Sequence, residues 1–260
     1  MSDTIDAGCL LLKNALDLDT HPVAVYLDKG ARVEPPYRDW RKLEKHRYCQ
    51  ALMRARSGEQ VVLEGGEIAC PAAAAAFGMK PLPPGLMSGD GLVGFGIVKD
   101  PATGRAMFEA MPRLPAGSVQ RLALSPLERA PARPDVVVVE GEPEKLMWLL
   151  LADLNLAGGA RRAGSTAVLQ ATCVDATVIP HLQQRMNFCL GCYGCREATD
   201  LAPGEAVLGF PGSMLEPIVE MVTYLREKAM PRSRAKAVYK RLAASMGDAS
   251  AGEKKGEVST

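Results

Sequence analysis

Four consecutive valines between Asp135 and Glu140 set the strongest limit on what this chain can fold into. A run of β-branched residues suits a strand that is buried on both faces, because both alternating rows of side chains then need cover. Residues 141–143 (Gly-Glu-Pro) then start a helix that we expect to run to Leu156 and to end at the glycine pair 158–159. The chain therefore contains a strand–helix unit in which helices must cover a sheet.

The rest of the chain alternates between the two hydrophobic periods in the same way. Strand-like runs occur at 23–27, 59–64, 95–98, 167–174 and 206–210, and helix-like spacing occurs at 5–18, 38–56, 71–76, 214–229 and 231–246. This mixture predicts an α+β fold in which a mixed sheet is flanked by helices. We expect residues 1–246 to form a single compact domain or two closely packed lobes, and residues 247–260 to form a flexible tail.

Composition excludes several classes of function. Lys and Arg number 31 and Asp and Glu number 30, so the net charge is +1 and nothing attracts nucleic acid or an anionic membrane. No apolar run approaches the roughly 20 residues that a bilayer-spanning helix needs, and no secretion signal is recognisable. We therefore expect a cytoplasmic protein whose partner is a small molecule or a redox protein; self-association stays open.

The chain has seven cysteines, an odd number, which argues against a disulfide framework and for reduced thiols or metal ligands. Cys9 lies beside three leucines, and Cys173 lies within the strand-like run 167–174. Both are interpreted as small buried hydrophobic residues. Five cysteines then remain as candidates for chemistry.

Three of these five, Cys189, Cys192 and Cys195, form the C-x2-C-x2-C run that supplies three ligands to a [4Fe–4S] cluster in bacterial ferredoxins. Intervening glycines let the backbone wrap closely around such a cluster. No cysteine follows Cys195, so a fourth ligand has to come from earlier in the chain. The candidates are Cys49 and Cys70, the latter followed by a proline that suits the first turn of a helix.

Two other readings of the cysteines remain open. Zinc could be held by two or more of the close cysteines together with Cys49, Cys70 or His181. Alternatively, Cys192 and Cys195 could act as a metal-free C-x-x-C redox relay or sulfur carrier, although the sequence predicts no strand-then-helix setting of the thioredoxin type around them. His181, near the cluster segment, is a candidate hydrogen-bond donor to a ligand, whereas His21 and His46 are assigned no role.

The glycines at 89, 91 and 94 match the spacing of a dinucleotide-binding fingerprint. That fingerprint should follow a strand and open a helix, whereas here it follows a Pro-Pro-Gly segment and runs into the strand-like 95–98. A structural turn is therefore the preferred interpretation.

Several segments of the chain together resemble the ArCR family, a group of prokaryotic proteins classed as a domain of unknown function. The resemblance covers most of the chain. It rests on five motifs: His-Pro-Val-Ala-Val-Tyr at 21–26, Tyr-Cys-Gln at 48–50, Cys-Pro at 70–71, Gly-Glu-Pro-Glu at 141–144, and Gly-Cys-Tyr-Gly-Cys-Arg at 191–196.

The resemblance implies a shared site built from three separate segments, with Cys49, Cys70 and Cys192 as recurrent cysteines and Cys195 or Cys189 as the fourth ligand in this member. If only three thiolates bind, one iron stays open to a substrate. The alanines at 72–76 stand where the family pattern has a glycine-rich stretch, which removes the basis for a backbone-contact role there.

The sequence thus predicts a cytoplasmic iron–sulfur protein, with [4Fe–4S] as the expected cofactor and zinc as the alternative. Its function would be electron transfer, or an enzyme's redox or sulfur-transfer chemistry on a small substrate at an open iron. The alternatives are a non-enzymatic module, stabilised by zinc or an iron–sulfur cluster, that binds a small ligand, and a metal-free thiol redox or sulfur-carrier protein.

Overall fold

The computed structural model describes residues 12–30, 36–160, 170–233 and 240–244. Seven strands form one open sheet in the order β2-β3-β4-β1-β5-β7-β6. The pair β2–β3 is parallel and every other neighbouring pair is antiparallel. The strands are β1 (Val23–Asp28), β2 (Arg41–Leu43), β3 (Val61–Glu64), β4 (Arg121–Pro126), β5 (Val136–Gly141), β6 (Asn187–Cys189) and β7 (Ala206–Pro211).

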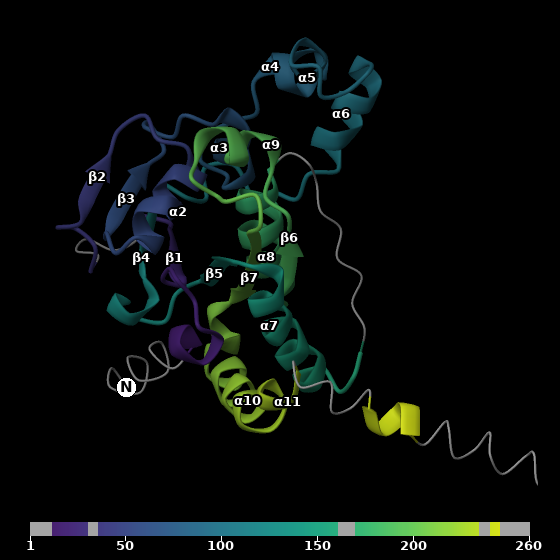
Figure 1. Ribbon diagram of the computed structural model, residues 1–260. Coiled ribbons are helices and arrows are strands. Elements are labelled where there is room, and N and C mark those ends of the chain that lie inside the picture. Colours follow the sequence, from purple (N-terminus) through teal and green to yellow (C-terminus); the bar gives the residue numbers. More distant parts are fainter. Residues whose placement is uncertain (1–11, 31–35, 161–169, 234–239, 245–260) are drawn as a thin grey trace, which may run out of the picture.

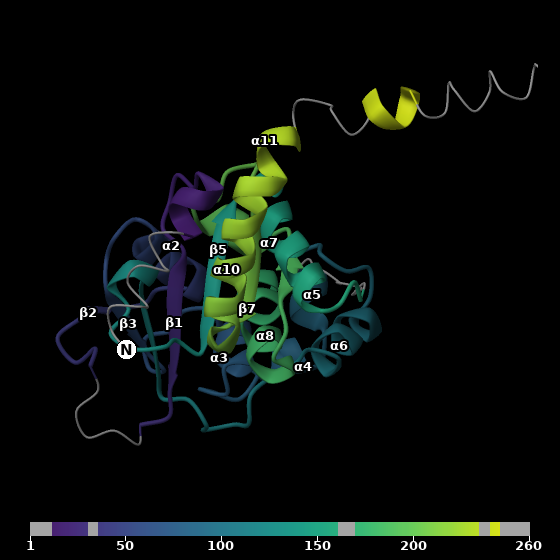
Figure 2. The same ribbon diagram turned by 90° about the horizontal axis from the view of Figure 1, so that it is seen from below.

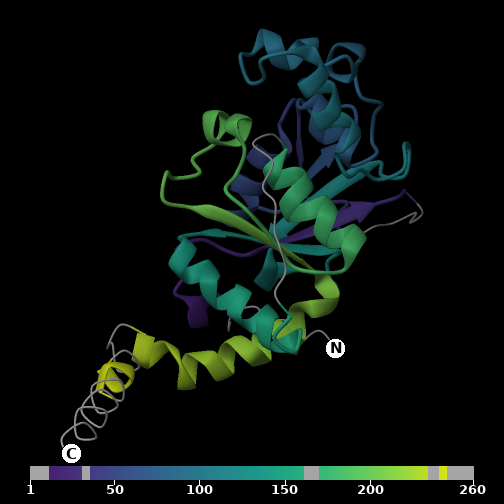
Figure 3. The same cartoon turned by 90° about the vertical axis from the view of Figure 1, so that its right-hand side faces the viewer.

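Helices cover both faces of this sheet (Figures 1 and 3). One face carries α2 (Tyr48–Arg56), α3 (Pro71–Ala76), the π-helix η2 (Ala171–Val178), α8 (Ile179–Gln183) and α9 (Tyr193–Ala198). The other face carries α7 (Pro143–Leu156), α10 (Leu215–Lys228) and the helical residues 12–16. Figure 2 shows α10 lying along β5 and β7. Further short elements are the 3-10 turns η1 (Leu127–Arg129) and η3 (Gly212–Met214), and helix α11 (Met230–Ser233). The α+β prediction is confirmed.

The valine run explains why both faces need cover. It forms β5, whose valines are all buried; Val136 and Val138 belong to the core under α2, α3 and η2, and Val137 and Val139 to the core under α7 and α10. Neighbouring β1 alternates in the same way. The sequence therefore predicted this central strand and the helix after it correctly.

Three short helices, α4 (Pro84–Met87), α5 (Asp90–Gly94) and α6 (Pro101–Glu109), pack on one another beyond α3 and stand out from the body of the molecule (Figure 1). We call residues 84–109 the helical cap. The glycine pattern at 89–94 lies here, in α5, and the strand expected at 95–98 does not form. Gly89 has a left-handed φ of 85° and lies against the backbone of α6, so this glycine serves the packing of the cap.

Two further element predictions are wrong. Residues 38–56 are not one helix: β2 occupies Arg41–Leu43, and α2 begins only at Tyr48. The strand expected at 167–174 is replaced, in the described residues from 170 onward, by the fully buried π-helix η2. An apolar run buried on all sides carries no period that separates a strand from a helix.

The π-helix can lie on the sheet because β7 has a glycine beneath it. A Cβ atom added at Gly209 would overlap the carbonyl oxygen of Ala176 in η2, which is backbone and cannot move aside as a side chain could. Gly209 has no positive φ, so the requirement is close approach of two backbones.

A buried ionic cluster ties α2 to the sheet. The guanidinium of Arg56 lies 3.2 Å from Glu140 of β5 and 3.0 Å from Glu205, which precedes β7. One cation thus faces two carboxylates. Burial is the main cause that raises the pKa of Glu140 to about 8; Arg56 opposes this effect and Glu205 adds to it.

Several predictions fall wholly or partly outside the described residues: the tail at 247–260, Cys9, and parts of the helices expected at 5–18 and 231–246. Among the described residues, no helix has both the length and the apolar character required to cross a membrane.

Replacing Gly209 with alanine should lower the free energy of unfolding by about 3 kcal/mol, because the methyl group forces η2 away from β7. Urea denaturation measures this change. Gly204→Ala is the matched control, since nothing lies within 4 Å of a Cβ at that position, and it should change stability by less than about 0.5 kcal/mol. Equal stabilities for the two variants would contradict the close approach.

The free energy of unfolding should carry a component, due to Glu140, that falls as pH rises from about 5 to about 8. The folded state keeps a proton on Glu140 up to pH about 8, whereas the unfolded state releases it near its ordinary value of 4.5, so rising pH favours unfolding. The slope is at most about 1.4 kcal/mol per pH unit.

Urea denaturation of Glu140→Gln across this pH range isolates that component. The variant should gain stability relative to the unmodified chain as pH rises, and the exposed Glu109→Gln should leave the pH profile unchanged. A stability difference between Glu140→Gln and the unmodified chain that does not change with pH would refute the assignment.

Candidate functional site: a cysteine-lined cavity

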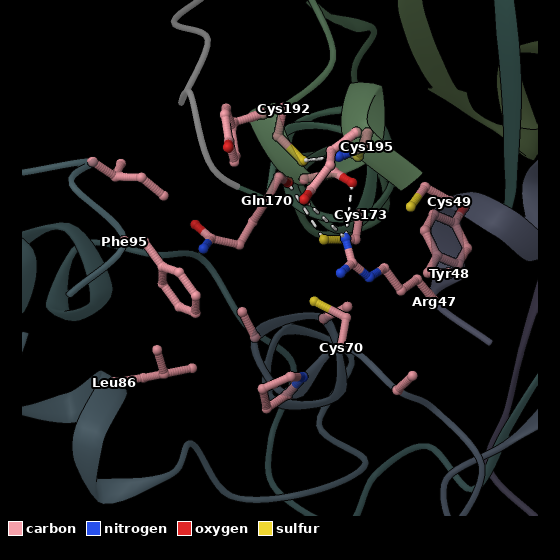
Figure 4. Close-up of a pocket in the computed structure, with 18 of the residues that line it drawn as sticks. Arg47, Tyr48, Cys49, Cys70, Leu86, Phe95, Gln170, Cys173, Cys192 and Cys195 are labelled. Atoms are coloured by element: carbon pink, nitrogen blue, oxygen red, sulfur yellow. Dashed lines mark hydrogen bonds and ion pairs between the residues drawn. The ribbon is translucent and has the colours of Figure 1, made fainter. Parts of the chain in front are cut away.

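A cavity of about 250 Å³ lies between the helix starts on one face of the sheet and the helical cap (Figure 4). Five cysteines from four separate segments line it: Cys49, Cys70, Cys173, Cys192 and Cys195. We call this set the thiol wall. Side chains of the cap line the other side, namely Leu86, Leu92, Phe95, Ile97 and Phe108.

Helix starts position most of the thiol wall. Cys70 is the N-cap of α3, immediately before the proline that opens this helix, and Cys49 is the second residue of α2. Cys192 is the N-cap of α9, and Cys195 lies in its first turn. A residue at a helix start can be placed precisely, because capping and tertiary packing fix the first turn.

Cys173 reaches the cavity from the π-helix. Its thiol donates to the carbonyl oxygen of Gln170 over 3.5 Å, and Gln170 itself has a left-handed φ of 58°. A π-helix and a left-handed residue are both features that recur at functional sites. The sequence interpretation of Cys173 as a small buried hydrophobic residue in a strand is confirmed for its burial and wrong for its element, which is η2. The sequence also did not place it on a cavity, which it lines.

Cys173 was missed because an apolar run gives no sign of which of its residues borders a cavity. The one available signal in the sequence was the number of cysteines, seven, which argues against a disulfide framework. In the described part of the chain all six cysteines are indeed free, and they are buried or half-buried.

Three thiols form a hydrogen-bonded group. The Sγ atoms of Cys192 and Cys195 are 2.8 Å apart, and the Cys195 amide donates to Cys192 Sγ over 3.2 Å. Hydrogen bonds from Cys192, Cys49 and Thr172 lower the pKa of the Cys195 thiol despite its burial. The hydrogen bonds that Cys49 and Cys192 make to Cys195, together with burial, raise the pKa values of Cys49 and Cys192. Cys195 is therefore the hydrogen-bond acceptor of this group, with Cys49 and Cys192 as donors.

The setting of Cys192 and Cys195 also differs from the prediction. The short strand β6 (Asn187–Cys189) precedes them, Cys192 caps α9 and Cys195 lies in its first turn, so the C-x-x-C pair does follow a strand and open a helix. The sequence argument that such a context is missing is wrong. A three-residue strand and a six-residue helix are too short for periodicity to reveal.

Cys189 and His181 are separated from the other candidates. Cys189 lies in β6, fully buried, opposite Val207, and does not line the cavity. His181 lies in α8 and is not among the lining residues either. Of the five cysteines proposed from the sequence, the structure thus brings four together and leaves out one member of the local triplet.

One cation lies among the residues that line the cavity. Arg47, the N-cap residue of α2, donates to the carbonyl oxygen of Gly194 over 3.0 Å and lies 3.8 Å from Glu197. Figure 4 shows its side chain reaching in among the cysteines. The guanidinium therefore lies beside whatever charge the thiols carry.

The sulfur positions bear on which metal group would fit. Two thiolates on one tetrahedral zinc lie about 3.8 Å apart, given Zn–S bonds of about 2.3 Å. Cys192 and Cys195 are closer than this, so both cannot bind the same ion unless one side chain turns. In the described residues, no three His, Cys, Asp or Glu side chains are arranged around a single ion. The donor chemistry, several thiols from separate segments around one cavity, would suit an iron–sulfur cluster.

The family sequence model described as "Uncharacterised ArCR" matches residues 11–221, which include every cysteine of the thiol wall. The chain belongs to the ArCR family. It is also 29% identical over 218 residues to an uncharacterized protein of the archaeon Methanocaldococcus jannaschii, covering 83% of this chain and 92% of that protein. No solved structure matches this ArCR chain.

Mild oxidation of the metal-free ArCR protein should join Cys192 to Cys195 before any other pair, because their sulfur atoms are in contact at 2.8 Å. Peptide mapping without a reductant would identify the bond, and thiol titration in denaturant would show the loss of two thiols. Cys189→Ala should not alter this result. A first disulfide that involves Cys70 or Cys173 would contradict the pairing.

Proposed function

We propose that this ArCR protein binds an iron–sulfur cluster, of the [4Fe–4S] type, at the thiol wall and uses it for redox or sulfur chemistry on a small substrate. The observation that carries the proposal is the convergence of cysteines from four segments on one cavity that has an apolar opposite side. Thiols needed only for packing have no reason to gather at the edge of a shared space. The reducing cytoplasm is the compartment we propose, since it keeps such thiols free.

Cys49, Cys70 and Cys192 are the proposed thiolate ligands, since each comes from a different segment. Cys195 cannot join Cys192 as a ligand without a change of rotamer. Cys173 lines the same cavity and is a further candidate thiolate ligand. When bound, a cluster with three thiolates would supply one-electron transfer and an iron that can act as a Lewis acid.

The chain's own residues supply the surroundings that such chemistry needs. The cap's apolar side chains make the side of the cavity opposite the thiol wall apolar, which strengthens electrostatic interactions nearby. Arg47 partly offsets the negative charge of thiolates. The amide of Cys195 donates a hydrogen bond to Cys192 Sγ and so stabilises negative charge on that sulfur.

A metal-free dithiol is the second candidate, favoured by the 2.8 Å contact and by the strand-then-helix setting of Cys192 and Cys195. In that case the two thiols would lose two electrons and two protons to a disulfide of a partner protein, forming a bond between their sulfur atoms. The helical cap would then limit how the partner protein can approach Cys192 and Cys195.

Elemental analysis of protein isolated under anaerobic conditions tests these candidates together. Iron and acid-labile sulfide in equal amounts, with a brown colour, would support the cluster. Stoichiometric zinc without sulfide would favour a metal-stabilised binding module over the cluster protein. Freely alkylated thiols without metal would favour the dithiol.

Single substitutions test the ligand set. Cys49→Ala, Cys70→Ala and Cys192→Ala should each lose most of the iron, because each removes a thiolate that comes from a separate segment of the chain. Cys189→Ala is the matched control and should keep the iron, since that side chain lies outside the cavity although it belongs to the local triplet. Thermal denaturation confirms that each variant is folded. Loss of iron in Cys189→Ala, with iron kept in Cys70→Ala, would overturn the proposed set in favour of the local triplet.

A further inference from the structure

The two sides of the cavity differ in chemistry. The cap contributes only apolar side chains, and Phe95, at its edge, is 72% exposed although it is a large aromatic residue. An exposed aromatic side chain at the rim of a cavity marks a surface that gains from contact with a ligand. Figure 4 shows Phe95 and Leu86 across the cavity from the cysteines.

Arg47 is the polar group best placed to orient a ligand. Its contact with Gly194 fixes one end of the guanidinium, which has five N–H donors in a planar fork. The carboxylate of Glu197 lies 3.8 Å away, beyond hydrogen-bond distance, and is 61% exposed. An anion bound to Arg47 could therefore displace Glu197 toward solvent at little cost.

We infer that the cavity binds a small monocarboxylic acid with an apolar or aromatic body. Its carboxylate pairs with Arg47, and its body lies against Phe95 and the other side chains of the cap. This inference rests on the proposed function, for which it names the class of substrate: the carbon atoms next to the carboxylate lie nearest the thiol wall.

Charge distinguishes a monocarboxylic acid from a phosphate and from a neutral ligand. A carboxylate carries one charge and matches the two parallel N–H groups of a guanidinium. A phosphate carries up to two, and Arg47 is the one cation among the described residues that line the cavity, with Glu197 beside it as a source of repulsion. A neutral ligand would fill the apolar side equally well but would leave Arg47 unused.

Binding of two acids and their neutral amides tests the inference. The probes are phenylacetate and hexanoate, with phenylacetamide and hexanamide as matched controls, each titrated into the isolated holoprotein and followed by methyl NMR. We expect both acids to bind at least roughly tenfold more tightly than their amides, the size of a hydrogen-bonded charge pair.

Four variants separate the contributions. Arg47→Gln should weaken the acids by roughly tenfold or more and leave the amides unchanged, whereas Arg47→Lys should retain part of the difference. Glu197→Gln should tighten the acids, since it removes a competitor for the guanidinium. Phe95→Ala should weaken acids and amides by the same factor.

Equal affinity for acids and amides, or no binding of either acid at millimolar concentration, would overturn the inference. So would tighter binding of inorganic phosphate than of either acid at the same site. Iron and sulfide are measured on the same preparation. Acid binding in protein without a cluster refutes the proposed function alone, and a loaded cluster with no acid binding refutes this inference alone.

Discussion

Strand β7 and the π-helix η2 approach so closely at Gly209 that no side chain fits between the sheet and the carbonyl oxygen of Ala176. This approach sets the depth at which η2 lies. Cys173 and Thr172 are carried on that helix, and Thr177 shares a hydrogen bond of 2.9 Å with the buried hydroxyl of Tyr48, the residue before Cys49. The position of two cavity cysteines thus depends on one glycine that lies outside the cavity.

Burial then gives the cysteines their chemical character. An apolar environment disfavours a thiolate, so each buried thiol on its own would stay protonated. Cys195 departs from this trend, because hydrogen bonds from Cys49 and Cys192 lower the pKa of its thiol despite burial. These hydrogen bonds set Cys195 apart from the two neighbouring thiols, whose pKa values are raised.

The ionic cluster around Arg56 holds the two main carriers of cysteines in place. Arg56 ends α2, the helix that starts near Cys49, and Glu205 follows α9, the helix of Cys192 and Cys195. Arg196 of α9 also donates to the carbonyl oxygens of Leu190 and Glu205, which secures the loop on either side of the C-x-x-C pair. These contacts over-determine the positions of two short helices whose own hydrogen bonds are few.

The sequence by itself determined the central strand, the helices that begin at Pro71 and Pro143, and the α+β class, because these follow from local periods and from proline at helix starts. It also pointed to Cys192 and Cys195, together with Cys189, through cysteine spacing, and to Cys70 through the proline that follows it. Cys49 was named as a further cysteine earlier in the chain and through the family resemblance. Only the tertiary structure decided that Cys173 belongs to the cavity, that Cys189 does not, and that the helical cap faces the thiols. Those facts depend on which backbones approach each other, and a contact between residues distant in the chain leaves no period in the sequence.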